Sequence, residues 1–256
     1  MIPISDLAFH YRLGRVLEHL GHKTFWEALA SFLSHSVRFD SWVALVFLPH
    51  NPPELLGFGG KKIMKEPLFS EYMKSFYAID PYYLFAMGNF ESGLYRLDDV
   101  APEYFRETEY YQRYFRLNVV EDELQFLLPM SSHGIFSLSL ASDYRFSDQE
   151  IGSLCITLPW LMPMMKAAAA MQTNFEISLP NQNVCLESQL QKKAAHPLTD
   201  REIQIAILLL SGHSTKTIAI NLDISPQTVK VHRRNLYEKL NVSSQGEIFA
   251  LFMAKM

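Results

Sequence analysis

The sequence predicts an α+β protein, with an N-terminal α/β/α sandwich around an antiparallel sheet and a C-terminal all-α domain of four helices. Three observations predict this class. Strand-like apolar runs occur in two close pairs, helical patterns flank these pairs, and the end of the chain shows helical patterns only. A length of 256 residues accommodates two modest domains. We therefore expect a sandwich domain over 1–171, a linker over 172–195 and a helical domain over 196–256.

The first elements follow from apolar spacing and turn chemistry. Leu7–Leu20 is amphipathic at helical spacing, and Thr24 followed by Glu27 predicts a capping box that opens a second helix. Trp42–Leu48 is a nearly continuous apolar run, typical of a buried strand. A turn with two prolines follows, so Leu55–Phe58 is predicted to return as the second strand of a hairpin.

A second pair of apolar runs predicts the rest of the sheet. Helical patterns at Leu68–Ala78 and Pro102–Phe115 come first. Leu124–Pro129 and Ile135–Ala141 follow, separated by a short polar turn that ends in glycine, and predict another hairpin. Helices would then flank an antiparallel sheet of four or five strands.

A long helix is predicted to close the first domain. Ser147 and Glu150 have the spacing of a capping box, and the helical pattern continues to Met171. Because a proline inside a helix removes a backbone hydrogen bond, we expect an interruption or a kink near Pro159 and Pro163.

Composition argues against membrane and secretory classes. The longest nearly apolar run, Leu154–Met165, is shorter than the roughly 20 residues that span a bilayer. The N-terminus is charged and lacks the continuous apolar core of a signal sequence. Cys155 and Cys185 form no C-x-x-C pair. We expect a cytoplasmic protein that contacts no membrane.

Charge divides the chain unequally. From Lys192 onward, nine Lys or Arg stand against five Asp or Glu and give a net charge of +4, while the remainder carries −8. The Gln172–His196 segment, in which this division lies, is rich in Asn, Gln and Ser and is typical of a linker. This asymmetry predicts a small module that binds a polyanion, joined to a larger module that does not.

The C-terminal signals predict a helix-turn-helix. Thr199 begins a capping box for an apolar helix that ends at Gly212, and Ser214 caps a short second helix. After a tight turn, Ser225 is the predicted N-cap of a third helix, with Pro226 at its first position. Two short helices, a turn and a third helix make the motif.

The third helix has two chemically different faces. Val229, Leu236 and Leu240 share one narrow stripe, which we expect to face the core. The opposite face offers cations, an amide and a small apolar group, which suit base edges in a major groove, and the N-terminal turn at Ser225 can meet phosphate. The side chains on that face are Gln227, Lys230, Val231 and Arg234.

A fourth helix has more apolar surface than a small domain can bury. Ser244 and Glu247 predict its start, and Ile248, Phe249 and Phe252 lie on one stripe. The stripe either pairs with the same stripe of a second copy, which suits a palindromic DNA site, or packs against the other domain.

These residues together resemble the LuxR-type DNA-binding domain. The motifs are Leu198-Thr199-x-Arg201-Glu202, Gly212-x-Ser214-x-Lys216-x-Ile218-Ala219 and Leu222-x-Ile224-Ser225-x-x-Thr228-Val229-Lys230-x-His232, followed by Asn235-Leu236, Lys239-Leu240 and Val242. The resemblance implies base contacts by Lys230, Val231 and Arg234, phosphate or bracing contacts by Thr228 and His232, and a dimer contact by the last helix. Thr215, Thr217 and Gln245 depart from the family pattern.

The larger domain has a thinner resemblance. Phe76–Pro81 is similar to the aromatic-x-x-x-Asp-Pro stretch of acyl-homoserine-lactone-binding domains, and Leu158–Leu161 is similar to part of their last helix. Tyr95 stands near the place of an expected tryptophan, and Leu94–Glu123 looks more like the input domains of solo LuxR-type regulators. The resemblance implies a PAS/GAF-like sensor domain for a small molecule.

Aromatic residues are dense around Asp80 and the run Glu121-Asp122-Glu123. We expect some aromatics and one carboxylate to line a pocket, which suits an amine or a cation better than a neutral lipid, although an acyl-lactone-like ligand stays open. The alternatives are that the aromatics are core residues and that Asp80 caps a helix. The candidate ligand-binding residues are Trp42, Tyr72, Phe76, Tyr77, Asp80, Tyr95 and Tyr111.

The sequence favours a regulator over an enzyme. It has no nucleophile elbow, dinucleotide fingerprint, zinc-protease motif or P-loop, and His10, His19 and His22 lack a metal-ligand partner. We expect no cofactor and no metal. The predicted function is a ligand-responsive, homodimeric transcription regulator of palindromic double-stranded DNA, with RNA polymerase as a further candidate partner. The alternative is a constitutive DNA-binding regulator whose N-terminal domain only dimerises or binds a partner protein.

Overall fold

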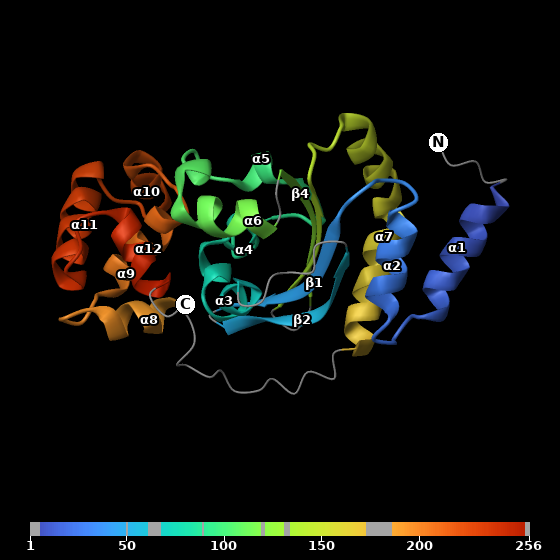
Figure 1. The fold of residues 1–256 in the computed structure, drawn as a ribbon, viewed down its shortest axis with the longest axis horizontal. Helices are drawn as coiled ribbons and strands as arrows, with labels where there is room; N and C mark the ends of the chain where they lie inside the picture. Colours follow the sequence, from blue (N-terminus) through green and yellow to red (C-terminus); the bar gives the residue numbers. More distant parts are fainter. Residues whose placement is uncertain are drawn as a thin grey trace.

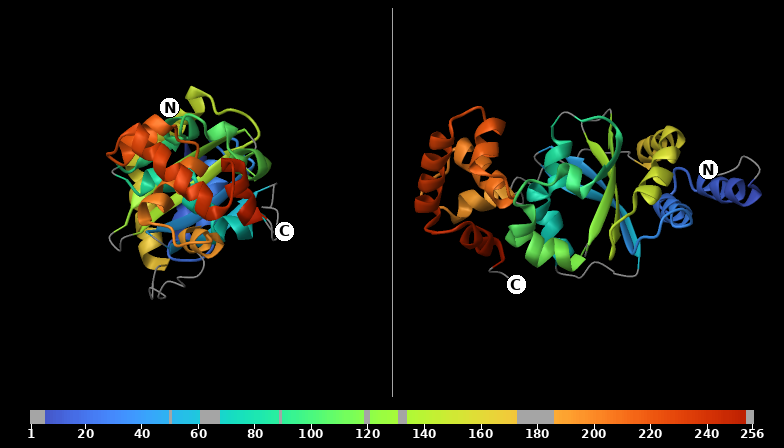
Figure 2. Two further views of the ribbon diagram at one scale, coloured as in Figure 1. Left: turned by 90° about the vertical axis from the view of Figure 1, so that its left-hand side faces the viewer. Right: turned by 90° about the horizontal axis from the view of Figure 1, so that it is seen from above.

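A computed structural model describes residues 6–49, 51–60, 68–88, 90–118, 121–130, 134–172 and 186–253. The molecule is elongated and layered (Figure 1). Along its length it consists of an outer helical layer, a β-sheet, an inner helical layer and a C-terminal helical bundle, and the view from above shows the same order (Figure 2). The predicted α+β class, a sandwich followed by an all-α domain, is confirmed.

The described strands form one antiparallel sheet in the order β2-β1-β5-β4-β3. Both predicted hairpins are confirmed, because β1 (Ser41–Leu48) pairs with β2 (Asn51–Gly60) and β4 (Asp122–Pro129) pairs with β5 (Ile135–Ser142). The edge strand β3 (Gly93–Arg96) was not predicted, since four residues are too few to show an alternating pattern.

The outer layer covers the sheet face that is remote from the bundle. It consists of α1 (Leu7–Glu18), α2 (Phe25–Leu33) and α7 (Asp148–Gln172) (Figure 1). The Trp26 ring of α2 stacks on Phe136 of β5, with ring centroids 4.5 Å apart. This contact fixes α2 against the middle of the sheet, where both side chains are fully buried.

Two predicted helix starts on this layer have different outcomes. The Ser147 hydroxyl accepts a hydrogen bond from the Glu150 N–H at 3.3 Å, and the Glu150 carboxylate accepts one from the Ser147 N–H at 2.9 Å, so this capping box is confirmed. The predicted capping box at Thr24 and Glu27 is wrong. The Thr24 hydroxyl forms a 2.8 Å hydrogen bond with His19 Nδ1 instead, and α2 owes its position to packing.

Helix α7 runs through Pro159 and Pro163 without a break, so the predicted interruption is absent. By length and composition alone α7 could cross a membrane, but 44% of its most apolar stretch is buried within the protein. Figure 1 shows it lying lengthwise beside α2. There Leu161 and Met165 join the core between this layer and the sheet.

The inner layer is made of short elements. They are α3 (Leu68–Lys74), the 3-10 turn η1 (Phe76–Ile79), α4 (Pro81–Ala86), α5 (Leu97–Val100), the 3-10 turn η2 (Phe105–Glu107), the π-helical turn η3 (Tyr111–Phe115) and α6 (Arg116–Asn118). The helix predicted over Pro102–Phe115 is therefore wrong. Thr108 has extended backbone, and its hydroxyl accepts a hydrogen bond from the Tyr111 N–H at 3.1 Å, so the chain leaves helical geometry and restarts there. The helix predicted over Leu68–Ala78 is similarly divided at Ser75.

The C-terminal bundle follows its sequence signals closely. Its helices are α8 (Leu186–Lys193), α9 (Asp200–Leu210), α10 (Thr215–Asn221), α11 (Pro226–Leu240) and α12 (Gln245–Met253). Thr199, Ser214 and Ser225 each accept a hydrogen bond from a backbone N–H of the helix they open, so the three predicted N-caps are confirmed. Gly212 follows α9 with φ +98°, a conformation that favours glycine.

Helix α8 lies inside the segment predicted as a linker. Leu186 and Leu190 are buried in the bundle core, and the Gln191 amide bonds both the N–H and the C=O of Leu198 at 2.9 and 2.7 Å. The sequence did not predict this helix, because two leucines in an otherwise polar segment are too few to show the apolar spacing of a helix. Packing therefore extends the helical unit to Leu186, and the first half of the predicted linker, 173–185, lies outside the described residues.

Candidate nucleic-acid interface and ligand cavity

The two faces predicted for the third helix of the motif, now α11, are confirmed by burial. Val229, Leu236 and Leu240 are buried against the rest of the bundle. The opposite face is exposed, and Val231 keeps 40% of its surface accessible between two exposed cations. The exposed side chains are Gln227, Lys230, Val231 and Arg234. The cations and the amide on this face can hydrogen-bond to the edges of bases, and the valine can contact a thymine methyl group.

The start of α11 is held by its cap. The Ser225 hydroxyl accepts a hydrogen bond from the Thr228 N–H at 3.0 Å and forms another with the Thr228 hydroxyl at 2.8 Å. Asp223 turns the chain with φ 50°, and Pro226 occupies the first helical position. Ser225 is exposed, while Thr228 and His232 are half-buried beside the exposed face. Four of the predicted DNA-contacting residues therefore lie on the exposed side of α11, with Ser225 at its start and Thr228 and His232 beside that side.

A partly buried ion pair connects α11 to α9. Lys239 Nζ lies 2.8 Å from the Glu202 carboxylate and donates to the Pro197 carbonyl at 3.0 Å. Burial alone would raise the pKa of Glu202, yet the hydrogen bonds from Lys239 and Thr199 hold it below its usual value. The pair therefore helps to hold α11 against α9, which carries much of the bundle core.

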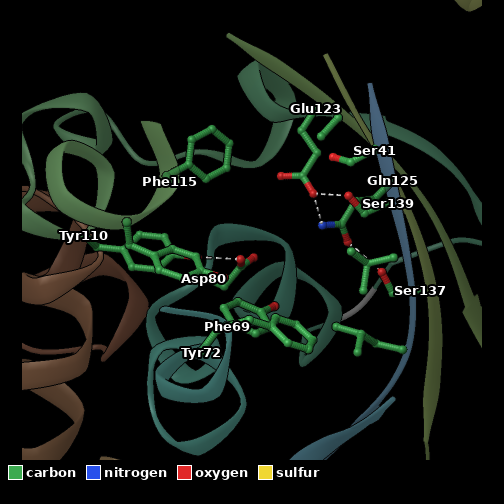
Figure 3. Close-up of a pocket in the computed structure, with 14 residues that line it drawn as sticks. Ser41, Phe69, Tyr72, Asp80, Tyr110, Phe115, Glu123, Gln125, Ser137 and Ser139 are labelled. Atoms are coloured by element: carbon green, nitrogen blue, oxygen red, sulfur yellow. Dashed lines mark hydrogen bonds between the residues drawn. The ribbon is translucent and has the colours of Figure 1, made fainter. Parts of the chain in front are cut away.

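A small cavity lies between the sheet and the inner helical layer (Figure 3). Its volume is about 50 Å³. Strands β1, β4 and β5 form one wall, and α3, η3 and the start of α4 form the other. Among the described residues, no three His, Cys, Asp or Glu side chains are grouped as a metal site requires.

Asp80 both lines the cavity and caps α4. Its Oδ1 accepts hydrogen bonds from the Tyr82 and Tyr83 N–H groups at 2.8 and 3.3 Å, and its Oδ2 accepts one from the Tyr110 hydroxyl at 2.8 Å. Burial raises the pKa of Asp80 to about 6, although these hydrogen bonds oppose the rise. Both proposed roles, pocket residue and helix cap, thus fall on one side chain.

Glu123 is the second carboxyl group in the cavity. Its Oε1 accepts hydrogen bonds from Gln125 Nε2 at 2.9 Å and from the Ser139 hydroxyl, and Gln125 Oε1 accepts one from the Ser137 hydroxyl at 2.7 Å. Burial and then the nearby charge of Asp80 raise the pKa of Glu123 to about 8. Gln125, Ser137 and Ser139 were missed by sequence reasoning. The available signal was the alternation of polar and apolar residues within two otherwise buried strands.

Two of the seven predicted ligand-binding residues, Tyr72 and Asp80, line the cavity. Trp42 does not, because alternate residues of a strand face opposite sides and β1 turns Trp42 toward the outer layer. There its ring lies against Gly57 and Gly59 of β2, where an added side chain would clash with it. Trp42 is thus a core residue of the outer face.

The other four predicted residues are not among the residues that line the cavity. Tyr77 lies edge-on to Tyr83, Tyr95 packs on Phe85, and Tyr111 stacks on Phe115. Phe76 is fully buried against the bundle. Phe76 and Tyr77 are therefore core residues, while Tyr95 and Tyr111 are partly buried against the same core.

The bundle is joined to the inner layer through α12. Phe249 stacks on Phe76 with ring centroids 5.3 Å apart, and Phe76 lies edge-on to Tyr110 and Tyr114, both of which line the cavity. Ile248 and Phe249 are fully buried. Of the two alternatives for the α12 stripe, the structure shows packing against the other domain; the Phe252 side chain lies outside the description.

A polar contact supports the same junction. The Gly212 carbonyl accepts a hydrogen bond from the Tyr104 N–H at 3.0 Å, and a side chain at Gly212 would lie 2.7 Å from the Phe105 nitrogen. The Glu103 carboxylate accepts hydrogen bonds from the hydroxyls of Ser214 and Thr217. Thr217 departs from the family pattern, and here its hydroxyl binds the other domain.

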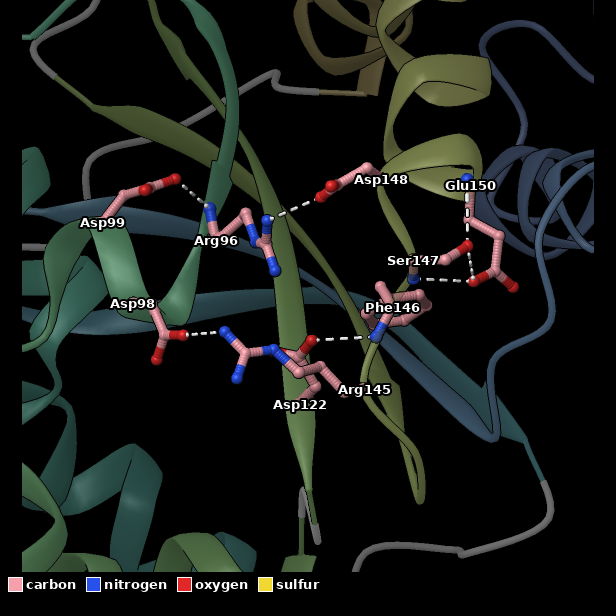
Figure 4. Close-up of polar contacts among 9 residues, drawn as sticks. All are labelled: Arg96, Asp98, Asp99, Asp122, Arg145, Phe146, Ser147, Asp148 and Glu150. Carbon is pink, nitrogen blue, oxygen red and sulfur yellow. Dashed lines mark hydrogen bonds and ion pairs between the residues drawn. The ribbon is translucent and has the colours of Figure 1, made fainter.

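The acidic neighbours of Glu123 have structural roles (Figure 4). Asp122 accepts hydrogen bonds from the backbone N–H groups of Glu123 and Phe146 at 2.9 and 3.0 Å. Nearby, Arg96 pairs with Asp148 at the start of α7 at 3.3 Å, which connects β3 to that helix. These contacts hold the connection between β5 and α7. Asp122 is not among the residues that line the cavity, whereas Glu123 is.

Comparisons with known proteins agree with the bundle's geometry. Residues 196–252 match the family model of bacterial regulatory proteins of the luxR family. The transcriptional regulatory protein UhpA of Escherichia coli is 54% identical over 52 residues, which are 20% of this chain and 26% of that protein. A nitrate/nitrite response regulator homolog of Haemophilus influenzae is 44% identical over 70 residues, or 27% of this chain and 34% of that protein. The chain spans about a third or less of the length of the curated relatives it matches.

The N-terminal domain has its own structural relatives. The VqsR LBD domain of Pseudomonas aeruginosa is 34% identical, with a TM-score of 0.60, over 65% of this chain and 99% of that one. Over both domains, SdiA of Escherichia coli is 20% identical with a TM-score of 0.47, and the match covers 96% of this chain and 97% of that one. By its likeness to the VqsR domain the sandwich resembles a ligand-binding domain, and by its match to the luxR family model the bundle resembles a DNA-binding domain.

Proposed function

Because this chain belongs to the LuxR family of transcription regulators, we propose that it binds palindromic double-stranded DNA as a homodimer and responds to a small molecule. Each copy would place α11 in a major groove, with the two helices about 34 Å apart, one turn of DNA. It would act in the cytoplasm, with RNA polymerase as its final partner. The side chains assigned to the DNA contact are Ser225, Gln227, Thr228, Lys230, Val231, His232 and Arg234.

One observation carries the response to a ligand. Tyr110 and Tyr114 line the cavity and pack on Phe76, and Phe76 stacks on Phe249 of α12. A ligand that moves this wall therefore acts on the helix that the family resemblance assigns to the dimer contact. It would shift the population between docked and released α12, because a ligand favours whichever state it binds more tightly.

A constitutive regulator is the second candidate. It is favoured by the size of the cavity, since about 50 Å³ is far below the roughly 300–1,000 Å³ of ligand pockets. In that case the N-terminal domain would only dimerise or bind a partner protein. The two candidates differ in whether a small molecule changes DNA binding.

DNA selection from a genomic library separates them. The purified chain is incubated at fixed salt with and without a metabolite pool from cell extract, and bound DNA is sequenced. We expect a palindromic site whose occupancy changes with the pool. Equal enrichment in both arms would favour the constitutive candidate, and the absence of any enriched site would contradict the DNA-reading assignment of α11.

A variant tests the connecting contact. Phe249→Ala removes the ring that stacks on Phe76, so the effect of the pool on occupancy should disappear. Tyr11→Ala is the control, because Tyr11 is an aromatic 68% exposed on α1 in the outer layer. A Phe249→Ala protein that still responds like the Tyr11→Ala protein would contradict this route.

A further inference from the structure

The described cavity lining is rich in acidic and hydroxyl groups and contains no cation. It contains two carboxyl groups, one amide, three serines and three tyrosines, with apolar side chains between them, and no Lys, Arg or His. Burying a carboxylate without a cation is costly, and both carboxyl groups here have raised pKa values. The lining residues are Ser41, Val43, Leu45, Phe69, Tyr72, Asp80, Tyr110, Tyr114, Phe115, Glu123, Gln125, Ser137, Ser139 and Ala141.

The two carboxyl groups are not equivalent. Both oxygens of Asp80 already accept hydrogen bonds from the protein. On Glu123 the hydrogen bonds from Gln125 and Ser139 both reach Oε1. Figure 3 shows the other oxygen pointing into the space between Phe115 and Asp80. Glu123 therefore presents to the cavity an oxygen that accepts hydrogen bonds once the carboxyl group is ionised, from a side chain that is only 5% exposed.

The wall that faces the sheet across the cavity is aromatic. The rings of Phe69 and Tyr72 are parallel with centroids 6.3 Å apart, and Tyr72 stacks on Tyr114 at 5.5 Å. Aromatic faces attract cations, and the attraction grows where water is excluded. Val43 and Leu45 provide an apolar floor for a hydrocarbon body.

We propose that this cavity binds a small organic amine, whose protonated nitrogen pairs with Glu123 and lies against the aromatic wall. The proposal rests on the sensing role given above and names its ligand class. An ammonium supplies both the charge that the lining lacks and the donors that the free oxygen of Glu123 can accept. A neutral alcohol of the same shape supplies only one hydrogen bond. The cavity, at about 50 Å³, holds an ammonium group and a few carbon atoms. A larger amine binds when the aromatic side chains of the wall move apart.

Matched amines and alcohols test the charge requirement. Isothermal titration of the full chain uses phenethylamine against 2-phenylethanol, and butylamine against 1-butanol. We expect each amine to bind at least tenfold more tightly than its alcohol. Glu123→Gln should abolish this difference, while Glu121→Gln, which removes an exposed carboxylate two residues away, should keep it. Equal binding of amine and alcohol, or no binding of either amine at millimolar concentration, would overturn the proposal.

Proton release provides a readout that needs no variant. With a pKa of about 8, Glu123 holds a proton at pH 7, and pairing with an ammonium favours the ionised form. Asp80 and Asp122 are the other acidic groups that raise this pKa, and Tyr72, Tyr82, Tyr110 and Tyr114 stay protonated because burial raises their pKa values further. Titrations in two buffers of different ionisation enthalpy should show up to one proton released per amine. Zero release would overturn the pairing with Glu123.

The DNA assay keeps the two failures apart. If no amine binds but the metabolite pool still changes DNA occupancy, the ligand class is wrong and the sensing role stands. If amines bind as expected but no DNA site is enriched, the cavity assignment stands and the proposed function fails.

Discussion

The two domains differ in where their functional polar side chains lie: the bundle exposes them to solvent, and the sandwich buries them. In the bundle, α11 buries Val229 and Leu236 and exposes Lys230 and Arg234. In the sandwich, the sheet buries Glu123, Gln125 and two serines among aromatic rings. A DNA reader must offer its charges outward to a partner as large as itself, whereas a sensor must enclose its ligand. The bundle therefore keeps most of its charges outside a largely apolar core, and the sandwich encloses several polar groups within its core.

The largest effect is expected from breaking the apolar core of the bundle. Leu236→Ala deletes a fully buried side chain and should lower the free energy of unfolding by about 2–5 kcal/mol, because the cavity left behind is only partly filled. Urea unfolding followed by circular dichroism measures this change. Ile220→Ala, at a residue 69% exposed on α10, should stay within about 0.5 kcal/mol of the parent. A loss below 1 kcal/mol at Leu236 would contradict the assigned core.

The polar core of the sandwich should show itself in the dependence of stability on pH. The pKa of Glu123 is raised from 4.5 to about 8 by burial and by Asp80, whose own pKa is raised to about 6. Between the unfolded pKa of Glu123, 4.5, and its folded pKa of about 8, the folded chain binds more protons than the unfolded one. The free energy of unfolding should therefore fall as pH rises from about 5 to 8. Urea titrations across this range check the slope. Glu123→Gln should flatten it and Glu121→Gln should leave it unchanged; a parent slope of zero would contradict the burial of Glu123.

The outward chemistry of the bundle should affect binding and leave stability alone. Arg234 is exposed and lies 3.8 Å from Glu238, a weak surface pair, so Arg234→Ala should hardly change unfolding. DNA affinity should fall by about 1–3 kcal/mol, with a relaxed preference at one base position, if the guanidinium reads a guanine. Affinities for a panel of single-base site variants measure this. An equal loss on every sequence would assign Arg234 to phosphate instead, and Arg201→Ala, on α9, is the matched control.

The same contrast explains how far the sequence could predict the molecule. In the bundle, the signals are local: Thr199, Gly212 and Ser225 each act on neighbours within a few residues, and helical spacing assigns the faces of α11. In the sandwich, the contacts are distant. Asp80 meets Tyr110 thirty residues away, and alternation along β1 cannot say which face meets the inner layer. Of the predicted ligand-binding residues, Tyr72 and Asp80 therefore line the cavity, whereas Trp42 lies on the opposite face of the sheet.

The smallest effect compares two caps that look alike in sequence. Ser225 caps α11 through a 3.0 Å hydrogen bond from the Thr228 N–H, so Ser225→Ala should lower the free energy of unfolding by about 1 kcal/mol. Thr24 makes no cap hydrogen bond and binds His19 on the surface, so Thr24→Ala should change it by less than about 0.5 kcal/mol. Urea unfolding of both variants beside the parent measures the difference. Equal losses would mean that the Thr24 hydroxyl caps α2 after all, and that local signals set the sandwich as strongly as they set the bundle.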